Sequence, residues 1–204
     1  MDYVKWEPIY KEILKEFGFD QKKDDEAAQI LSNMIQEDKV TDLFNLLEEK
    51  DVIICGGAPS LQDELKEIKD EVVLAADGAT SVLINNGIIA DVIVTDLDGI
   101  VGDLLYSNRL GSFMVVHAHG DNIKMLKKVV PELTNVLGTT QSEPFDNIHN
   151  FGGFTDGDRC VFIAKNFNVR TIKLIGFDFD DQNVGEIKKK KLNWAHKLIS
   201  KLLF

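Results

Sequence analysis

The hydrophobic positions of residues 1–50 follow a helical period. They recur at spacings of three and four, which places them on one face of a helix. They are Trp6, Ile9, Ile13 and Phe17, followed by Ile30, Met34 and Ile35. Thr41 precedes the run DLFNLLEEK, with Asp42 in the favourable first turn, which predicts an N-cap and a further short helix. Residues 1–50 are therefore predicted to form a small helical N-terminal region.

From Asp51 onward the pattern changes to short, nearly continuous apolar runs separated by amphipathic segments. The runs are DVIIC at 51–55, VVLAA at 72–76, DVIVT at 91–95, FMVVH at 113–117, TNVLG at 134–138 and TIKLIG at 171–176. Such alternation is typical of parallel strands that are buried on both faces by helices. Residues 51–204 are thus predicted to form an α/β domain, a three-layer, mostly parallel sheet with helices on both faces.

A final helix is predicted from about Glu186. Its apolar face comprises Leu192, Ala195, Ile199, Leu202 and Leu203, and a helix with one such face packs back onto its domain. Lys188 to Lys191 stand at its start. Because consecutive residues spread around a helix, most of these lysines should be solvated, although one could reach a triphosphate.

Composition favours small-molecule substrates. The 204 residues are 44% hydrophobic, enough for one sizeable core. The net charge of -11 argues against general affinity for nucleic acid or for an anionic membrane.

Cys55 and Cys160 lie in apolar patterns without C-x-x-C spacing, so we expect buried cysteines in a reducing cytosol. No stretch has the length and apolarity of a membrane span, and we expect a cytoplasmic protein.

Carboxylates follow several of the predicted strands. Asp77 follows VVLAA, Asp96 and Asp98 follow DVIVT, and Asp121 comes shortly after FMVVH. Loops at the carboxyl ends of parallel strands converge, and gathering these carboxylates there would be strongly unfavourable without cations. Hard oxygen ligands suit Mg²⁺. Asp96 and Asp98 can share an ion if a turn begins at Asp96; the alternative is a solvated turn followed by a helix cap.

Other loop residues are candidates for binding phosphate. Gly56 and Gly57 allow a ligand to approach the backbone, and Ser60 with Asp63 suggests an N-cap with a capping box; a plain turn is the alternative. In the loop His117 to Asn122, His117 and His119 suit hydrogen bonds to phosphate or shape the pocket as neutral groups, alongside Asn122. A zinc site of both histidines with Asp121 is the weaker alternative.

The segment NFGGFTDGDRC, residues 150–160, leads into another helix. Asp156 or Asp158 is predicted to cap this helix, which should begin near Asp158. Arg159 suits a phosphate or a salt bridge equally well. We expect Phe151 and Phe154 to be buried in the core; stacking on a flat heterocycle is the alternative.

The order ADGA, TDLDG, HAHGDN, FGGFTDGDR and GFDF resembles the archaeal 6-hydroxymethyl-7,8-dihydropterin pyrophosphokinases over nearly the whole chain. The sheet domain is more distantly similar to thiamin pyrophosphokinases, whose ADGG and GDxDS motifs match Ala76 to Ala79 and Thr95 to Gly99. Thr95 and Gly99 depart from GDxDS, and the thiamin family's aspartate-rich loop is replaced by His117 to Asn122. These departures suit an alcohol substrate other than thiamin.

The closer resemblance implies transfer of diphosphate from ATP to the hydroxymethyl group of a dihydropterin, with Mg²⁺ and release of AMP, a step of pterin and folate-type cofactor synthesis. Asp77, Asp96 and Asp98 would hold the metal, and Asp121 would join them or orient the acceptor hydroxyl. Asp156 or Asp158 would accept the pterin N–H groups, a pairing that supports specificity.

Two alternatives stay open from the sequence: a pyrophosphokinase for thiamin or another heterocyclic alcohol, and a sugar-nucleotide transferase or non-catalytic nucleotide-binding module. The expected partners are ATP and the alcohol, without nucleic acid or membrane. A homodimer is compatible with the sequence.

Overall fold

The structure is a computed structural model that describes residues 2–203. Met1 and Phe204, at the outer ends of the two predicted segments, lie outside the described residues. The strands are β1 (Asp51–Cys55), β2 (Val72–Ala76), β3 (Val92–Thr95), β4 (Phe113–Ala118), β5 (Val136–Thr140), β6 (Ile148–His149) and β7 (Thr171–Ile175). The helices are α1 (Tyr3–Phe17), α2 (Gln21–Met34), α3 (Val40–Leu47), α4 (Leu61–Glu64), α5 (Ala79–Asn85), α6 (Val101–Arg109), α7 (Ile123–Val129), α8 (Asp156–Asn166) and α9 (Glu186–Leu203), with 3-10 turns at Leu65–Glu67 and Val130–Glu132.

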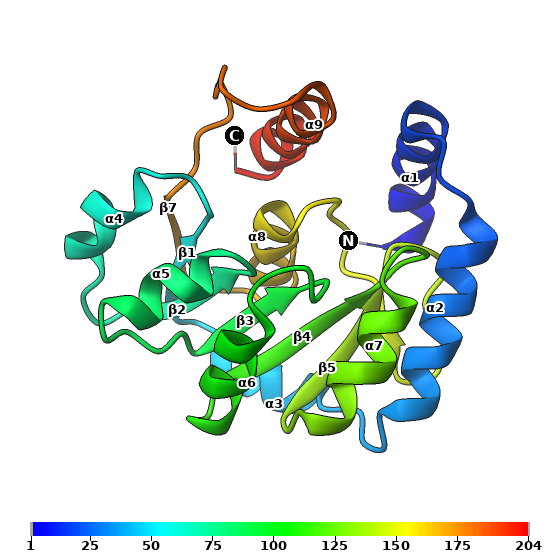
Figure 1. Cartoon of the computed structure of the whole chain (residues 1–204), viewed down its shortest axis with the longest axis horizontal. Helices are drawn as coiled ribbons and strands as arrows, with labels where there is room; N and C mark the ends of the chain where they lie inside the picture. The colour runs from blue at the N-terminus through cyan, green and yellow to red at the C-terminus, as the bar shows by residue number, and fades with distance from the viewer. Residues whose placement is uncertain (1, 204) are drawn as a thin grey trace.

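The strands form one parallel, 7-stranded sheet in the order β6-β5-β4-β3-β2-β1-β7 (Figure 1). Alternate residues of each strand face opposite sides. Ile53 and Ile93 pack with helices α2, α4, α5, α6 and α7, whereas Val52 and Val92 pack with α3, α8 and α9. The predicted three-layer α/β fold, with helices on both faces, is therefore confirmed. Both cysteines are buried and free, as expected.

Several predicted details are wrong for local reasons. A short strand, β6, pairs with β5 and was not predicted from the sequence. Strand β5 extends beyond its predicted end at residue 138, through Thr139 and Thr140. Helix α3 begins at Val40, whose N–H is capped by the Asp38 side chain, so Thr41 is not its N-cap. Ser60 is the N-cap residue of helix α4, as predicted, but the Ser60 side chain makes no capping hydrogen bond, so the predicted capping box is absent. The apolar face of α9 also includes Trp194 and Leu198.

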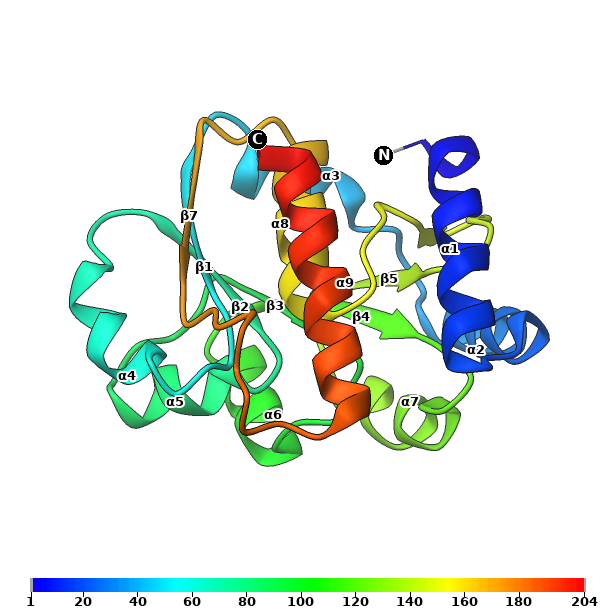
Figure 2. The same cartoon turned by 90° about the horizontal axis from the view of Figure 1, so that it is seen from above.

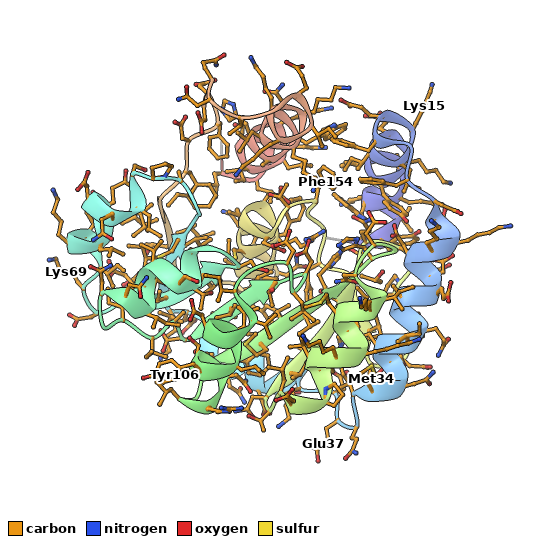
Figure 3. All side chains as sticks on the ribbon, viewed as in Figure 1. Lys15, Met34, Glu37, Lys69, Tyr106 and Phe154 are labelled. Carbon is orange, nitrogen blue, oxygen red and sulfur yellow. The ribbon has the colours of Figure 1, made fainter. Side chains whose placement is uncertain are left out.

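The N-terminal helices pack against the α/β domain. Helix α2 lies beside α7 and β5 (Figure 1), and its Ala27, Ala28 and Leu31 belong to the hydrophobic cluster of the sheet. In Figure 2, α9 lies over α8, and α1 stands apart from both ribbons. Side chains bridge the space, because Trp6 of α1 contacts Phe162 of α8 edge to face at 5.9 Å between ring centroids. Phe154, labelled in Figure 3, completes this contact between α1 and α9. The helical region therefore borders the carboxyl edge of the sheet.

The strand order creates a crevice at one end of the sheet. From β1 the chain moves strand by strand to β6, and then crosses back to place β7 on the other side of β1. Ligands of open α/β sheets bind at such a reversal, beyond the carboxyl ends of the strands. Among residues 2–203, no helix combines the length and apolar character that a membrane crossing requires.

Candidate active site

A cluster of carboxylates lies at the carboxyl edge of the sheet. Asp77 follows β2, Asp96 and Asp98 follow β3, and Asp156 begins α8. Each offers an oxygen that lies within 4.8 Å of the others. The structure thus brings together the aspartates that the sequence assigned to a metal, and adds Asp156. Asp121, offered as a further member, lies outside this cluster.

Asp77 is held by the neighbouring strand and loop. The Thr95 hydroxyl donates to Asp77 Oδ2 at 2.5 Å, and the Gly99 N–H donates to the same oxygen at 3.3 Å. A Cβ at Gly99 would overlap with Asp77 Oδ1, so only glycine leaves room for the carboxylate in this position. Burial, followed by the charges of Asp98 and Asp96, raises the pKa of Asp77 to about 6 in spite of these hydrogen bonds.

A tight turn brings Asp96 and Asp98 to the same site. Leu97, between them, adopts a left-handed conformation with φ of 68°, and its N–H donates to the Thr95 hydroxyl at 2.8 Å. In a continuing strand the two side chains would lie on opposite faces. Asn122 fixes the turn from the next loop, because its Nδ2 donates to the carbonyl oxygens of Asp96 and His117, each at 2.7 Å.

Asp156 enters the cluster from the first turn of α8. Thr155 is the N-cap, and Asp158 completes a capping box by accepting from the Thr155 N–H at 3.0 Å. The predicted cap at Asp156 or Asp158 is therefore wrong, because Thr155 is the N-cap, whereas the helix begins at Asp156, close to the predicted start near Asp158. Arg159 Nη1 donates to Asp156 at 2.8 Å, which ties the cluster to a nearly buried guanidinium.

The electrostatics of the cluster fit a hard divalent cation. Burial, followed by the charge of Asp96, raises the pKa of Asp156 and of Asp98. Burial would also raise the pKa of Asp96, but the His119 hydrogen bond and the Arg159 charge outweigh it and lower that pKa. Asp77 Oδ1 and Asp96 Oδ1 are buried without a hydrogen-bond partner among the described residues. Unsatisfied, mutually repelling carboxylate oxygens are suitable ligands for Mg²⁺.

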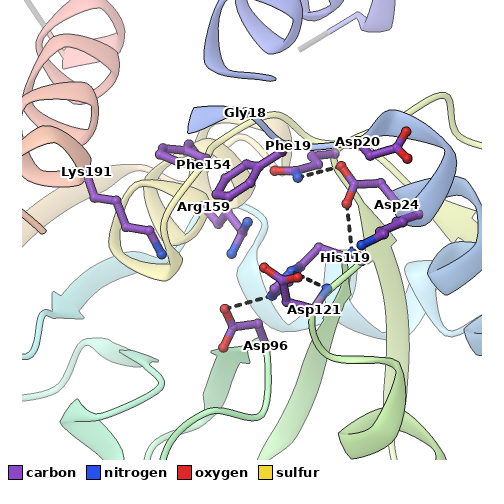
Figure 4. Close-up of a pocket in the computed structure, with 13 residues that line it drawn as sticks. Gly18, Phe19, Asp20, Asp24, Asp96, His119, Asp121, Phe154, Arg159 and Lys191 are labelled. Atoms are coloured by element: carbon purple, nitrogen blue, oxygen red, sulfur yellow. Dashed lines mark hydrogen bonds and ion pairs between the residues drawn. The ribbon is translucent and has the colours of Figure 1, made fainter. Parts of the chain in front are cut away.

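Two cavities flank the cluster. The first has a volume of about 150 Å³ and lies between α2, the β4–α7 loop and the start of α8 (Figure 4). Its lining comprises Gly18, Phe19, Asp20, Lys23, Asp24, Asp96, His119, Gly120, Asp121, Gln141, Phe154, Arg159 and Lys191.

The second cavity, of about 580 Å³, lies at the carboxyl ends of β1, β2 and β7, where the strand order reverses. It is lined by the glycine-rich loop after β1, by Asp77, Asp98 and Asp156, by Phe177 and Phe179, and by Lys188 and Lys191 of α9. The carboxylate cluster therefore forms the boundary between the two cavities, and Lys191 borders both.

The other predicted binding residues divide into two groups. Those that line a cavity are Gly56, Gly57 and Asp156 in the second, and His119, Asp121 and Arg159 in the first. Ser60, His117, Asn122 and Asp158 line neither cavity. His117 is buried against Thr139 at 3.1 Å, and burial together with the Arg159 and His119 charges lowers its pKa far below the ordinary value.

Asp158 is fully buried and accepts from Phe154 N and from the Thr155 N–H and hydroxyl. Its hydrogen bonds are thus made within the fold, and nothing in its surroundings supports the expected pairing of Asp158 with a pterin. Phe154 belongs to the core, as predicted, but it also lines the first cavity.

Asp24 and Gln141 line the first cavity but were missed from the sequence. Asp24 lies within a helix of polar composition, where a single aspartate gives no signal. Gln141 directly follows β5, and a correct end for that strand would have placed it among the loop candidates.

This arrangement defines a class of protein: an open α/β protein in which clustered carboxylates separate a large and a small cavity at the carboxyl edge of a parallel sheet. The comparisons with known proteins agree. The family described as "6-hydroxymethylpterin diphosphokinase MptE-like" matches residues 26–184. This chain belongs to that family, and the resemblance observed in its sequence is confirmed.

Curated archaeal relatives named "6-hydroxymethyl-7,8-dihydropterin pyrophosphokinase" are similar along nearly their whole length. The protein of Pyrococcus furiosus is 42% identical over 217 residues, covering 98% of this chain and 93% of the relative. That of Methanocaldococcus jannaschii is 41% identical, covering 99% and 96%. That of Methanothermobacter thermautotrophicus is 40% identical, covering 98% and 94%.

Proposed function

We propose that this protein transfers a diphosphate group from ATP to the hydroxymethyl oxygen of 6-hydroxymethyl-7,8-dihydropterin and releases AMP. One observation carries the proposal: Asp96 lines the first cavity, Asp77, Asp98 and Asp156 line the second, and their oxygens lie within 4.8 Å of one another. A phosphate group at this boundary is within reach of ligands in both cavities. Family membership and the names of the relatives support the same reaction.

The sizes of the cavities support a proposed assignment of the two substrates. The second, at about 580 Å³, lies within the range of roughly 300–1,000 Å³ that is usual for ligand sites, and takes ATP. Its Gly56–Gly57 backbone faces the phosphates, and Phe177 and Phe179 give the adenine an apolar surface. The first cavity, about 150 Å³, is the smaller of the two and takes the smaller ligand, the dihydropterin.

Asp77, Asp96, Asp98 and Asp156 hold Mg²⁺ in this proposal. When bound, the metal neutralises the charge that develops on the transferring phosphoryl oxygens. The hydroxymethyl oxygen bonds to the β-phosphorus, the bond from that phosphorus to the α,β-bridging oxygen breaks, and AMP departs with the electron pair. The hydroxyl proton is released. Asp121, in the first cavity but outside the cluster, orients the hydroxyl.

Positive charges complete the site. Lys191 borders both cavities, so its ammonium group can interact with the diphosphate both before and after its transfer from ATP to the acceptor. Arg159 is nearly buried and donates to Asp156 at 2.8 Å, so it keeps the carboxylate oriented toward the cluster. Such preorganised charges stabilise a transition state without further rearrangement.

The test is an AMP-release assay with ATP, Mg²⁺ and one alcohol at a time, analysed by chromatography. We expect AMP and the pterin diphosphate to form together with 6-hydroxymethyl-7,8-dihydropterin, and no AMP above background with thiamin or without acceptor. AMP formation with thiamin alone would reassign the acceptor. Absence of AMP with every alcohol would contradict the proposed reaction.

We further propose a cytoplasmic location, as the sequence predicts. The homodimer compatible with the sequence stays a prediction that light scattering of the purified protein tests.

A further inference from the structure

Gln141 lines the first cavity and carries a buried acceptor atom that is unsatisfied among the described residues. The residue is 4% exposed. Nε2 donates to Asp24 Oδ2 at 2.8 Å, whereas Oε1 is buried without a hydrogen-bond partner among the described residues. The amide has one acceptable orientation, because its reversal would set a carbonyl oxygen against the Asp24 carboxylate.

Asp24 is itself fixed by groups from other segments. The Tyr10 hydroxyl of α1 donates to Oδ2 at 2.7 Å, and the Gly120 N–H of the β4–α7 loop donates to Oδ1 at 2.8 Å. The residue is 3% exposed. Asp24 thus holds the Gln141 amide rigidly, with Oε1 turned away from it. A rigid acceptor that the fold leaves unpaired calls for a donor from a ligand.

The rest of the lining describes that ligand. Phe19 and Phe154 supply aromatic surface, and Phe17 packs on both, with ring centroids 5.5 Å from Phe19 and 5.0 Å from Phe154. Arg159 Nε is a buried donor without a partner among the described residues. An acceptor, a donor and aromatic walls together suit a flat heterocycle with both N–H groups and acceptor atoms.

We propose that Gln141 determines acceptor specificity: its Oε1 accepts a hydrogen bond from the 2-amino group on the pyrimidine ring of the pterin, and Asp24 is its positioning residue. Asp24 and Asp96 lie on opposite sides of His119 in Figure 4, so a pterin that contacts Gln141 can direct its hydroxymethyl group toward Asp96. The inference rests on the proposed function. It gives Gln141 the role that the sequence analysis assigned to Asp156 or Asp158.

The test compares two fluorescent ligands, 6-hydroxymethylpterin and 6-hydroxymethyllumazine, in which an oxo group replaces the 2-amino group. Wild type should bind the pterin about 10- to 100-fold more tightly, because an oxygen in that position cannot donate to Gln141. Gln141→Met, which keeps the length of the side chain but removes the amide, should bind both ligands about equally. Gln62→Met is the matched control, since Gln62 is exposed on α4 and pairs with Asn86.

Asp24→Asn tests the positioning role. It preserves shape but allows the Gln141 amide to turn, so the preference for the pterin should shrink while binding of a nonhydrolysable ATP analogue stays within about twofold. Because the ratio of two affinities is measured on one preparation, partial unfolding does not alter it, and the ATP analogue confirms that the protein is folded.

The outcomes separate the two proposals. A wild-type protein that binds the pterin, together with a Gln141→Met variant that retains the full preference, would overturn the specificity role and leave the proposed function standing. A wild-type protein that binds neither ligand in the presence of Mg²⁺ and the ATP analogue would overturn both.

Discussion

Gly99 and Asp77 lie in direct contact: the Gly99 N–H donates to Asp77 Oδ2 at 3.3 Å, and a Cβ at Gly99 would occupy the position of Asp77 Oδ1. The turn after β3 therefore packs directly against the carboxylate that follows β2. The identity of residue 99 controls where the Asp77 carboxylate lies, although residue 99 itself carries no functional group.

Gly99→Ala should lower kcat by about 10- to 100-fold, because the methyl group displaces the Asp77 carboxylate from the cluster. Steady-state AMP release measures the loss. Gly102→Ala is the matched control, since nothing lies within 4 Å of a Cβ at Gly102 in α6. Equal activity in the two variants would show that the Asp77 position does not matter for turnover.

Asp96→Asn and Asp98→Asn should each lower turnover by at least about 100-fold while the protein stays folded. Each substitution removes a charge from the proposed metal cluster, and the loss is comparable to that of a key electrostatic group. AMP release at limiting Mg²⁺ and circular dichroism provide the measurements. Asp42→Asn, on the exposed face of α3, serves as the control. Near-wild-type rates in both cluster variants would refute their metal role.

The raised pKa of Asp77, about 6, predicts how the stability of the metal-free protein changes with pH. Over roughly pH 4 to 6 the folded state binds a proton that the unfolded state has released, so this group lowers stability as pH rises through that window. The cost, fully present above about pH 6, is roughly 2 to 3 kcal/mol. The Asp77→Asn variant avoids this cost, because its side chain carries no ionisable group.

Urea unfolding in EDTA measures the effect. Relative to Asp77→Asn, wild type should lose stability between pH 4 and pH 7, and Mg²⁺ at pH 7 should restore wild type more than the variant. A stability difference that stays constant with pH would contradict the raised pKa.

Lys191→Met should lower kcat/KM by about 10- to 100-fold, because Lys191 borders both cavities and faces the proposed path of the diphosphate. Lys190→Met is the control one position away, since Lys190 is exposed and lines neither cavity. The same AMP assay applies. If the two variants lose activity equally, the loss is caused by the change in the net charge of α9, and the specific role of Lys191 is contradicted.

The sequence predicted the fold well where physical signals are strong. Buried parallel strands such as β1 and β2 are uninterrupted apolar runs, so their bounds agree with the structure. Strand β6 has two residues, Ile148 and His149, and no run of that length stands out from a polar loop. The ends of helices were less predictable: Thr41 and Asp158 are good capping residues, but Lys39 and Thr155 occupy the N-cap positions.

Within the candidate site, the sequence located residues that directly follow strands. Asp77, Asp96 and Asp98 were recognised because parallel strands end at a common edge. Asp156 was recognised as a binding residue but not as part of the cluster, because only the packing of α8 on the sheet brings it there. The pairing of Asp24 with Gln141 joins positions far apart in the chain, and no local pattern encodes it.

Asp24 belongs to α2 and Lys191 to α9, yet both border the first cavity. During synthesis, α2 emerges from the ribosome early and α9 late. The first cavity is therefore complete only after α9 has been translated and has docked. A nascent chain that still lacks α9 also lacks the Lys191 side chain, so translation order delays the completion of both cavities until α9 has docked.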